Sequence, residues 1–155
     1  MESARRATRD DVARVAELAR AMRAELRSMR GGALWSEREA WAEPLEDVYA
    51  SLLERDDARL FVGTIGDVVV GYGAVVVESL HDGARLGVVT DLFVEDGARA
   101  VGVGESLIEC VLAFTAEQRC VGVDALALPG HRAAKNFFEG SGFTARAIVM
   151  HRPAG

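Results

Sequence analysis

The chain has 155 residues, of which 50% are hydrophobic and 27% are charged, and it carries a formal net charge of -6 at pH 7. This length fits one domain over residues 1–155, and the composition is far from the polar, highly charged sequences that stay disordered. The acidic balance argues against a nucleic-acid partner, because affinity for phosphate needs clustered Lys and Arg.

The sequence contains no apolar run long enough to span a bilayer as a helix; Val68–Val77, one of the longest, is interrupted by glycine. Basic residues lie in Met1–Arg9, but an amphipathic pattern follows them, which is not typical of a signal peptide. We therefore expect a cytoplasmic protein with no membrane partner. The two cysteines have neither metal-ligand nor redox spacing, and we expect no metal.

The N-terminal third predicts a short strand over 2–7 followed by two helices. Thr8-Arg9-Asp10-Asp11 matches a capping box with Asp in place of Glu, and apolar residues then recur in steps of three and four from Val12 to Met29. Gly31-Gly32 ends this helix, and a second helical pattern covers 41–53.

The middle of the chain predicts three strands. Residues 59–65 and 68–80 are rich in β-branched side chains and meet at Gly66-Asp67, a two-residue hairpin signal. After a loop, residues 85–94 have the composition of a further strand. Antiparallel pairing follows from the short connections.

Helices and strands alternate in the last third. A helix is predicted over 103–118, a strand over 121–128, a helix over 132–140 and a final strand over 143–151. The strand at 85–94 and the next helix and strand form a right-handed βαβ unit. The pattern predicts an α/β (α+β) fold with a mixed sheet and helices on its faces.

A glycine-rich turn, Arg99-Ala100-Val101-Gly102-Val103-Gly104-Glu105, opens the helix of this unit. Free NH groups at a helix start attract anions, and glycine lets the main chain approach a pyrophosphate closely. Arg99 can add a charge-assisted bond. Tight packing of the turn on the sheet explains the glycines equally well. A dinucleotide fingerprint would need a third glycine where the chain has Leu107.

The succession of strand, Arg-x-x-Gly-x-Gly and amphipathic helix resembles the acetyl-CoA-binding motif of the GNAT superfamily of N-acetyltransferases. Ala7–Asp11 is similar to the family's opening, and Val70-Gly71-Tyr72-Gly73 is similar to its third-strand start. Ala134–Phe143 resembles the family's Ala-x-x-Phe-Tyr-Glu-x-x-Gly-Phe. These motifs occur in the family's order over nearly the whole chain.

The resemblance implies a GNAT fold: a mixed, mostly antiparallel sheet of six to seven strands, flanked by about four helices and splayed between its fourth and fifth strands. It implies acetyl-CoA as cosubstrate, with the main chain of Leu92, Phe93 and Val94 binding the pantetheine arm. His131 stands where the family often has an Asn that contacts the cofactor, although a helix-capping role explains it too. The implied pyrophosphate-binding residues are Arg99, Ala100, Val101, Gly102, Val103, Gly104 and Glu105.

Phe138 departs from the family pattern, because a tyrosine there commonly protonates the departing thiolate. A thiol of pKa about 8.5 leaves unprotonated near neutral pH at a cost of roughly 2 kcal/mol, which slows the reaction without forbidding it. Two interpretations stay open: an enzyme that lacks this acid, or a binding module that kept the fold and lost turnover.

Three residues are candidates for the proton acceptor. Thr90-Asp91-Leu92-Phe93-Val94 looks like the Glu-Asp-Phe-Phe-Val stretch of spermidine acetyltransferases, with Thr90 in place of the glutamate and able to hold a relay water. Asp91 is expected to face the opposite side of the strand, in a catalytic or structural role. Glu78, late in the neighbouring strand, is either a base or a solvated strand end.

The acceptor is expected to be a small-molecule amine. The region between the first two helices is acidic, which favours steering of a cationic amine, although a solvated helix face explains it too. A possible homodimer would cover an edge strand or the last strand. Besides an N-acetyltransferase, a non-catalytic CoA-binding or partner-binding GNAT domain and an unrelated phosphate-binding βαβ protein remain open. The acidic residues are Glu37, Glu39, Glu43, Glu46 and Asp47.

Overall fold

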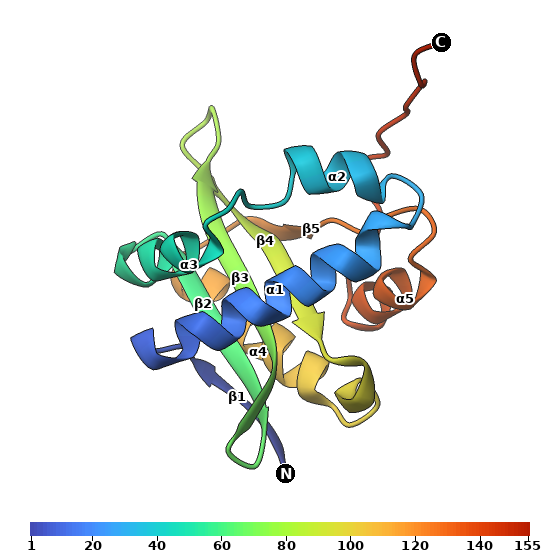
Figure 1. Cartoon of the computed structure of the whole chain (residues 1–155). Coiled ribbons are helices and arrows are strands. Elements are labelled where there is room, and N and C mark those ends of the chain that lie inside the picture. The colour runs from blue at the N-terminus through green and yellow to red at the C-terminus, as the bar shows by residue number, and fades with distance from the viewer.

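Five strands form one sheet in the order β1-β2-β3-β4-β5 in the computed structural model, which describes residues 1–155 (Figure 1). Strands β1 to β4 pair antiparallel, and β5 pairs parallel to β4, so the sheet is mixed as expected. The strands are β1 (Glu2–Arg6), β2 (Ala58–Ile65), β3 (Val68–Ser79), β4 (Arg85–Val94) and β5 (Gly122–Ala125).

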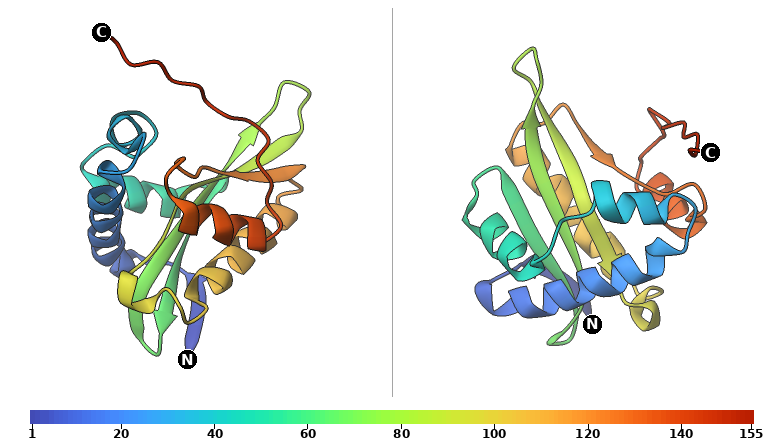
Figure 2. Two further views of the ribbon diagram at one scale, coloured as in Figure 1. Left: turned by 90° about the vertical axis from the view of Figure 1, so that its right-hand side faces the viewer. Right: turned by 45° about the horizontal axis from the view of Figure 1, so that its top comes forward.

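Helices cover both faces of this sheet (Figure 2). Helices α1 and α3 pack with one face around a core that includes Leu60 and Tyr72, whereas α4 packs on the other face against Val75 and Val89. Each of these helices buries one apolar side, which is what their sequence periodicity predicts. The helices are α1 (Val12–Arg27), α2 (Gly32–Arg38), α3 (Leu45–Glu54), α4 (Val103–Glu117) and α5 (Arg132–Gly140).

The start of α1 follows the predicted capping box. The main-chain NH of Thr8 donates to the Asp11 carboxylate at 2.8 Å, and the Thr8 side chain completes the reciprocal contact. Arg5 of β1 also donates to both oxygens of Asp11 at 2.7 and 3.0 Å. The first helix is therefore fixed to the first strand at its N-terminus, and the aspartate performs the role usually taken by glutamate.

Strands β4 and β5 separate halfway along β4. Their parallel pairing runs from Leu86 opposite Gly122 to Val89 opposite Ala125 and then stops, while the pairing of β4 with β3 continues to Val94. The main chain of Thr90–Val94 therefore has a neighbouring strand on one edge only. This is the splay that the resemblance predicted between the fourth and fifth strands.

A β-bulge lies at the point where the splay begins. Ala74 of β3 pairs with Asp91 and the next residue, Val75, pairs with Val89, so Thr90 is an extra residue in β4. An extra residue bends a strand and interrupts the alternation of its side chains. Thr90 and Asp91 consequently lie on the same side of the sheet, and the expectation that they face opposite sides is wrong.

The predicted count of six to seven strands is wrong, because residues 143–151 form no strand. The segment after α5 runs out from the molecule toward the C-terminus (Figure 2), and Ile148, Val149 and Met150 are 79%, 80% and 87% exposed. Strand composition alone is insufficient where no neighbouring strand supplies the hydrogen bonds. The free edge of β5 stays unpaired.

The count of about four helices is also wrong by one, because α2 forms between the two helices that the sequence predicted. Gly31 has a positive φ of 79° directly before it, so the glycine pair both ends the first helical region and starts a new turn. Pro44 precedes α3 at its N-cap, consistent with a proline tolerated only near the first turn. None of the helices is both long and apolar enough to cross a bilayer.

Candidate active site

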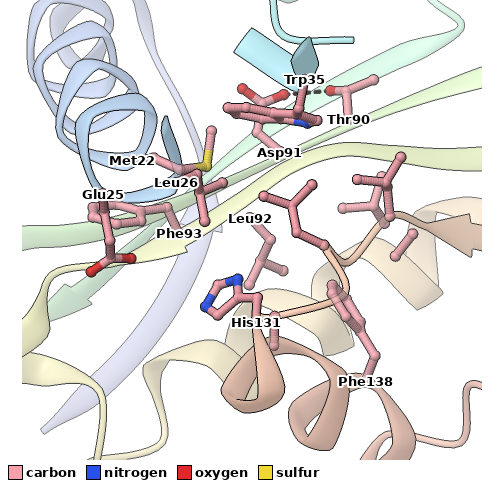
Figure 3. A pocket seen from close by; sticks show the side chains of 15 residues that line it. Met22, Glu25, Leu26, Trp35, Thr90, Asp91, Leu92, Phe93, His131 and Phe138 are labelled. Atoms are coloured by element: carbon pink, nitrogen blue, oxygen red, sulfur yellow. Dashed lines mark hydrogen bonds between the residues drawn. The ribbon is translucent and has the colours of Figure 1, made fainter. Parts of the chain in front are cut away.

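A cavity open to solvent lies where β4 and β5 separate (Figure 3). Helix α1 forms one wall and α5 the opposite wall, with the splayed half of β4 between them. Eleven of its fifteen lining residues are hydrophobic, and the polar groups come from four residues. An apolar cleft with a few convergent polar groups is typical of a small-molecule site. The polar residues are Glu25, Thr90, Asp91 and His131.

Asp91 accepts hydrogen bonds from four side chains. Its Oδ1 accepts from Thr90 Oγ1 at 2.5 Å and from Trp41 Nε1 at 3.0 Å. Its Oδ2 accepts from Tyr72 at 2.9 Å and from Tyr49. The loop before α3, α3 itself, β3 and β4 each contribute a donor, so the carboxylate is held by elements that are far apart in the sequence.

Burial raises the pKa of Asp91, although its four donors act in the opposite direction. The side chain is 5% exposed, and a carboxylate removed from water loses hydration that hydrogen bonds only partly replace. Burial and the nearby carboxylate likewise raise the pKa of Tyr49 and of Tyr72 well above 10, so both phenols keep their protons. In this cluster Asp91 can accept a proton, whereas Tyr49 and Tyr72 act only as hydrogen-bond donors.

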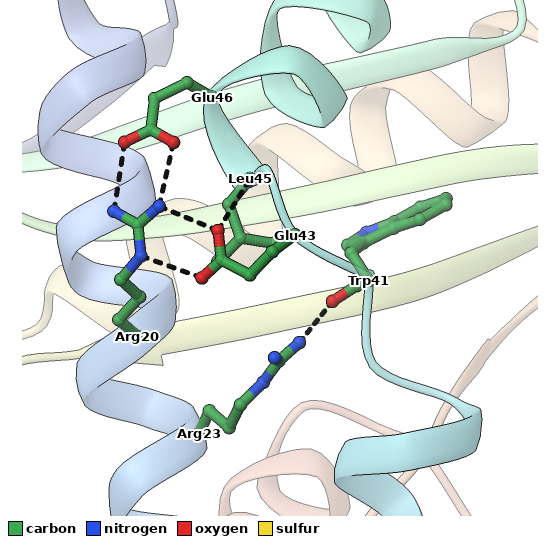
Figure 4. A network of polar contacts seen from close by, with 6 residues as sticks. All are labelled: Arg20, Arg23, Trp41, Glu43, Leu45 and Glu46. Atoms are coloured by element: carbon green, nitrogen blue, oxygen red, sulfur yellow. Dashed lines mark hydrogen bonds and ion pairs between the residues drawn. The ribbon is translucent and has the colours of Figure 1, made fainter.

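A second, smaller cavity meets the first at Thr90 and Asp91. Its walls are mostly apolar or aromatic and come from α1, α3 and the segment between them, where Trp35 and Trp41 both contribute. Arg23 also lines it and donates to the main-chain carbonyl of Trp41 (Figure 4). Thr90 and Asp91, together with Met22 and Trp35, therefore line both cavities.

Arg99 is already held by protein groups. Its Nε donates to the Val94 carbonyl at 2.8 Å, its Nη2 donates to both oxygens of Glu25 at 2.8 and 2.9 Å, and its guanidinium lies 5.3 Å from the Phe93 ring centroid. The residue joins the turn before α4 to α1 at the rim of the cavity. Its predicted contact with a pyrophosphate stays a prediction.

The two glycines of the motif have different structural roles. Gly102 is the N-cap of α4 with a φ of 88°, a conformation that favours glycine. Gly104 packs against α5, since a Cβ there would lie 3.0 Å from Phe137. Helix packing therefore accounts for Gly104, whereas the predicted close approach to a ligand stays a prediction. The first turn of α4 still offers the main-chain NH groups of Val103, Gly104 and Glu105, beside Ala100 and Val101.

His131 and Phe138 lie on the α5 side of the cavity, opposite Leu92 (Figure 3). His131 is the N-cap residue of α5, but its side chain forms no capping hydrogen bond. Burial lowers the pKa of its imidazole, so it is neutral near pH 7. Phe138 packs edge-on against Phe137 and tilted against Phe143, with no hydroxyl to donate.

Glu78 lies apart from these residues. It pairs with Leu86, four residues before Thr90 in β4, which corresponds to about 13 Å along the strand. It is exposed and lines neither cavity, so the structure brings Thr90 and Asp91 together without it.

Tyr49 and Tyr72 complete the cluster around Asp91, and sequence reasoning missed both of them. Only the register of β3 and the packing of α3 reveal them.

Most of the acidic residues in α2, in the following loop and in the first turn of α3 are paired with arginine. Arg20 of α1 forms bidentate pairs with Glu43 and with Glu46, with closest distances of 2.8 Å (Figure 4). Glu37 pairs with Arg27 at 2.8 Å and Glu39 contacts Arg38 at 3.4 Å, while Asp47 forms no ion pair. Most of the carboxylates that suggested steering of a cationic amine are therefore already paired with arginines of the same chain.

The site fits acetyl-CoA in two respects that can be read from the chain itself. The splayed edge of Thr90–Val94 offers main-chain groups that no strand occupies, and an extended pantetheine arm can bond such an edge. The start of α4 offers NH groups with glycine as N-cap, suitable for a pyrophosphate. The apolar cavity lies between these two features.

Comparisons with known proteins agree with this geometry. The model of the acetyltransferase (GNAT) family matches residues 19–143. The fold is similar to that of a mutant BH1408 protein from Bacillus halodurans, with a TM-score of 0.84, 16% identity, and 97% of this chain and 98% of that chain covered.

Two acetyltransferase structures are also similar. An aminoglycoside acetyltransferase, meta-AAC0020, from an uncultured soil metagenomic sample gives a TM-score of 0.73 at 21% identity, covering 99% of this chain and 95% of that chain. Glucosamine-6-phosphate N-acetyltransferase from Arabidopsis thaliana gives 0.72 at 16% identity, covering 99% and 98%. No curated protein gives a significant match to the sequence. Because the family model matches most of its residues, the chain belongs to the acetyltransferase (GNAT) family.

Proposed function

We propose that the chain transfers an acetyl group from acetyl-CoA to a small primary amine by direct attack of the amine on the thioester. The observation that carries the proposal is the open edge of β4 at Thr90–Val94, beside an apolar cavity that Thr90 and Asp91 line. Acetyl-CoA supplies an activated acetyl group and a thiol that leaves.

Different parts of the chain would contact different parts of the bound acetyl-CoA. Main-chain groups of Leu92, Phe93 and Val94 orient the pantetheine arm, and a free NH there polarises the carbonyl. The turn from Ala100 to Glu105 holds the pyrophosphate. His131, which is neutral and lines the cavity, would donate a hydrogen bond to the bound cosubstrate.

For the acceptor, the structure favours an amine with an apolar body over a polycation. Trp35 and Trp41 line the smaller cavity beside Asp91, and an aliphatic or aromatic amine can bury its body there. The arginine pairs of Glu37, Glu43 and Glu46 leave little free negative charge for a polyamine. The amine is cationic in solution and gives one proton to water on entering the apolar cavity, so that it attacks as the neutral nitrogen.

A thiol-release assay tests the proposal. Acetyl-CoA is offered with a panel that contains phenethylamine, an aliphatic monoamine, spermidine and an aminoglycoside, and free thiol is followed with a disulfide reagent. We expect release above the hydrolysis blank with the monoamines, and less with spermidine. Thermal stabilisation by CoA, compared with ADP at equal concentration, gives a readout that does not depend on turnover.

Phe138 favours a second candidate, a non-catalytic CoA-binding or partner-binding domain, because α5 brings no hydroxyl to the cavity. Stabilisation by CoA without thiol release for any amine would support this candidate over the enzyme. Equal stabilisation by CoA and ADP would instead favour a phosphate-binding protein unrelated to acyl transfer.

A further inference from the structure

The hydrogen bond between Thr90 and Asp91 has a defined direction. A threonine hydroxyl has one proton and two acceptor lone pairs, whereas an ionised carboxylate only accepts. Thr90 Oγ1 lies 2.5 Å from Asp91 Oδ1 and 3.4 Å from the Ala74 carbonyl, so its proton points to the carboxylate. The lone pairs of the Thr90 oxygen are thus left for a donor from the cavity.

Thr90 is also the member of the Asp91 cluster that is best placed to exchange a proton with a ligand. Tyr72 is completely buried, and Tyr49 is 1% exposed. Both phenols hold their protons because burial raises their pKa values. Trp41 Nε1 is a donor that does not ionise. Thr90 is half-buried and lines both cavities.

The charged groups around the cluster form no contact with Asp91 that would block proton exchange through Thr90. Arg23 of α1 faces the smaller cavity and bonds the Trp41 carbonyl. Glu25 faces the larger cavity but is paired with Arg99, and His131 lies across that cavity on α5. None of these four groups forms a hydrogen bond to Asp91, so its carboxylate is not committed to a cation.

We propose that Thr90 and Asp91 act as a proton relay, in which Thr90 Oγ1 takes a proton from the acceptor nitrogen while passing its own to Asp91 Oδ1. The inference rests on the proposed acetyl transfer from a thioester to an amine. The nitrogen forms the new C–N bond, the C–S bond breaks, and the sulfur leaves with the electron pair as a thiolate. The proton lost by nitrogen ends, after one shift through Thr90, on Asp91.

The relay accounts for two features that otherwise lack a purpose. The bulge turns Thr90 to the same side as Asp91, which regular alternation would prevent. Burial of the carboxylate makes it a stronger proton acceptor than a solvated aspartate, as its raised pKa indicates. Thr90 touches the substrate and is the catalytic residue of the pair, whereas Asp91 acts through it.

Two substitutions at one position test the relay. Thr90→Val keeps the shape and removes the hydroxyl, and Thr90→Ser keeps the hydroxyl. With the best amine of the panel, we expect Thr90→Val to lower kcat by about 100-fold or more, the usual contribution of general base catalysis, with KM changed less than about threefold. Thr90→Ser should stay within about tenfold of the native chain.

A titration of the unliganded protein provides a readout independent of activity. The Thr90 hydroxyl lowers the pKa of Asp91, so its removal should move the titration midpoint of the Asp91 carboxyl upward. Carbon-detected NMR or infrared spectroscopy of the carboxyl group measures this midpoint. Thr90→Ser should titrate like the native chain. Thr64→Val, the same change at a buried position in β2 away from both cavities, is the matched control.

The outcomes separate the relay from the function on which it rests. No thiol release by the native chain with any amine would overturn both proposals. Turnover by the native chain that persists in Thr90→Val, with an unchanged pH profile, would overturn the relay and leave acetyl transfer intact. A loss in Thr90→Ser as large as that in Thr90→Val would also overturn the relay, because the hydroxyl would then not be the group that matters.

Discussion

Single residues in this protein combine structural and chemical roles, and Asp91 is the clearest case. Its four donors come from β3, α3, β4 and the loop before α3, so protonating or removing it affects the packing of all of them. A buried polar group that is fully hydrogen-bonded rigidifies its surroundings. The same contacts that stabilise the core around Tyr72 therefore fix the geometry of the candidate site.

A prediction at this scale concerns Gly102. Its φ of 88° disfavours any residue with a Cβ, so Gly102→Ala should lower the free energy of unfolding by about 1 kcal/mol and weaken CoA binding by distorting the start of α4. Urea unfolding and a CoA titration measure the two effects.

Gly97 provides the matched control for this substitution. It lies in the same turn, has no positive φ, and a Cβ there would meet nothing within 4 Å, so Gly97→Ala should leave both measurements unchanged. Equal effects of the two substitutions would contradict the role assigned to the backbone of Gly102.

Sequence reasoning identified Thr90 and Asp91 but placed them wrongly with respect to each other. Alternation along a strand is a good assumption until a bulge intervenes, and nothing in the local sequence marks Thr90 as an extra residue. Tyr49 lies within the helical pattern predicted over 41–53, which says nothing about its hydroxyl. Its hydroxyl meets Asp91 through tertiary packing, which the periodicity of a helix cannot predict.

At the scale of elements, one arginine adds a polar link to the apolar contact between α1 and α3. Arg20 joins Glu43 and Glu46 and so fixes the segment that leads into α3 (Figure 4). The hydrogen bonds from Arg20 lower the pKa of Glu43 from 4.5 to about 2. Because all three side chains are exposed, we treat the link as a determinant of orientation more than of stability.

The lowered pKa of Glu43 gives a pH-dependent prediction. A carboxylate whose pKa is lower in the folded state contributes stability above its unfolded value of about 4.5, and that contribution is lost as the pH falls through about 2. The native chain should therefore be more stable than Glu43→Gln at pH 7, and the two should converge at pH 2. Denaturant midpoints over this range measure the difference.

Asp47→Asn is the matched control, since Asp47 lies in the first turn of α3, close to Glu43 in the sequence, and forms no ion pair. Its effect should not follow the same pH dependence. A difference between the native chain and Glu43→Gln that stays constant from pH 7 to pH 2 would argue against the Arg20 pair as its source.

Most elements follow from the sequence because each has its own local signal. The hairpin at Gly66-Asp67, the capped α1 and the strand-to-helix turn before α4 all form where periodicity and turn residues agree. The segment after α5 has strand composition, yet whether it pairs depends on a neighbour that local sequence does not specify. Helix α2 is too short for a periodic signal.

For the whole molecule, self-association stays a prediction, and the C-terminal segment supplies its physical basis. Residues 144–155 contain two arginines, one histidine and no acidic residue, whereas the chain as a whole carries -6. A second copy therefore offers a complementary charge, and the open edge of β5 offers hydrogen bonds. Arg146 already pairs with Asp124 of β5 in the same chain, so the segment lies close to that edge.

Replacing Ile148, Val149 and Met150 together with serine tests this basis. The three side chains are exposed, so the triple variant should unfold at the same denaturant concentration as the native chain at high dilution. Sedimentation at micromolar concentration should show a dimer for the native chain and a monomer for the variant, because the apolar contact is lost. A native chain that sediments as a monomer would contradict the homodimer.

The bulge in β4 also has a consequence for insertions and deletions. Val89 and Asp91 pair with consecutive residues of β3, so the ladder would be regular if residue 90 were absent. A chain shortened by that one residue would keep every other side chain of the sheet on its present face. The pairing of β3 with β4 therefore does not need a residue at position 90.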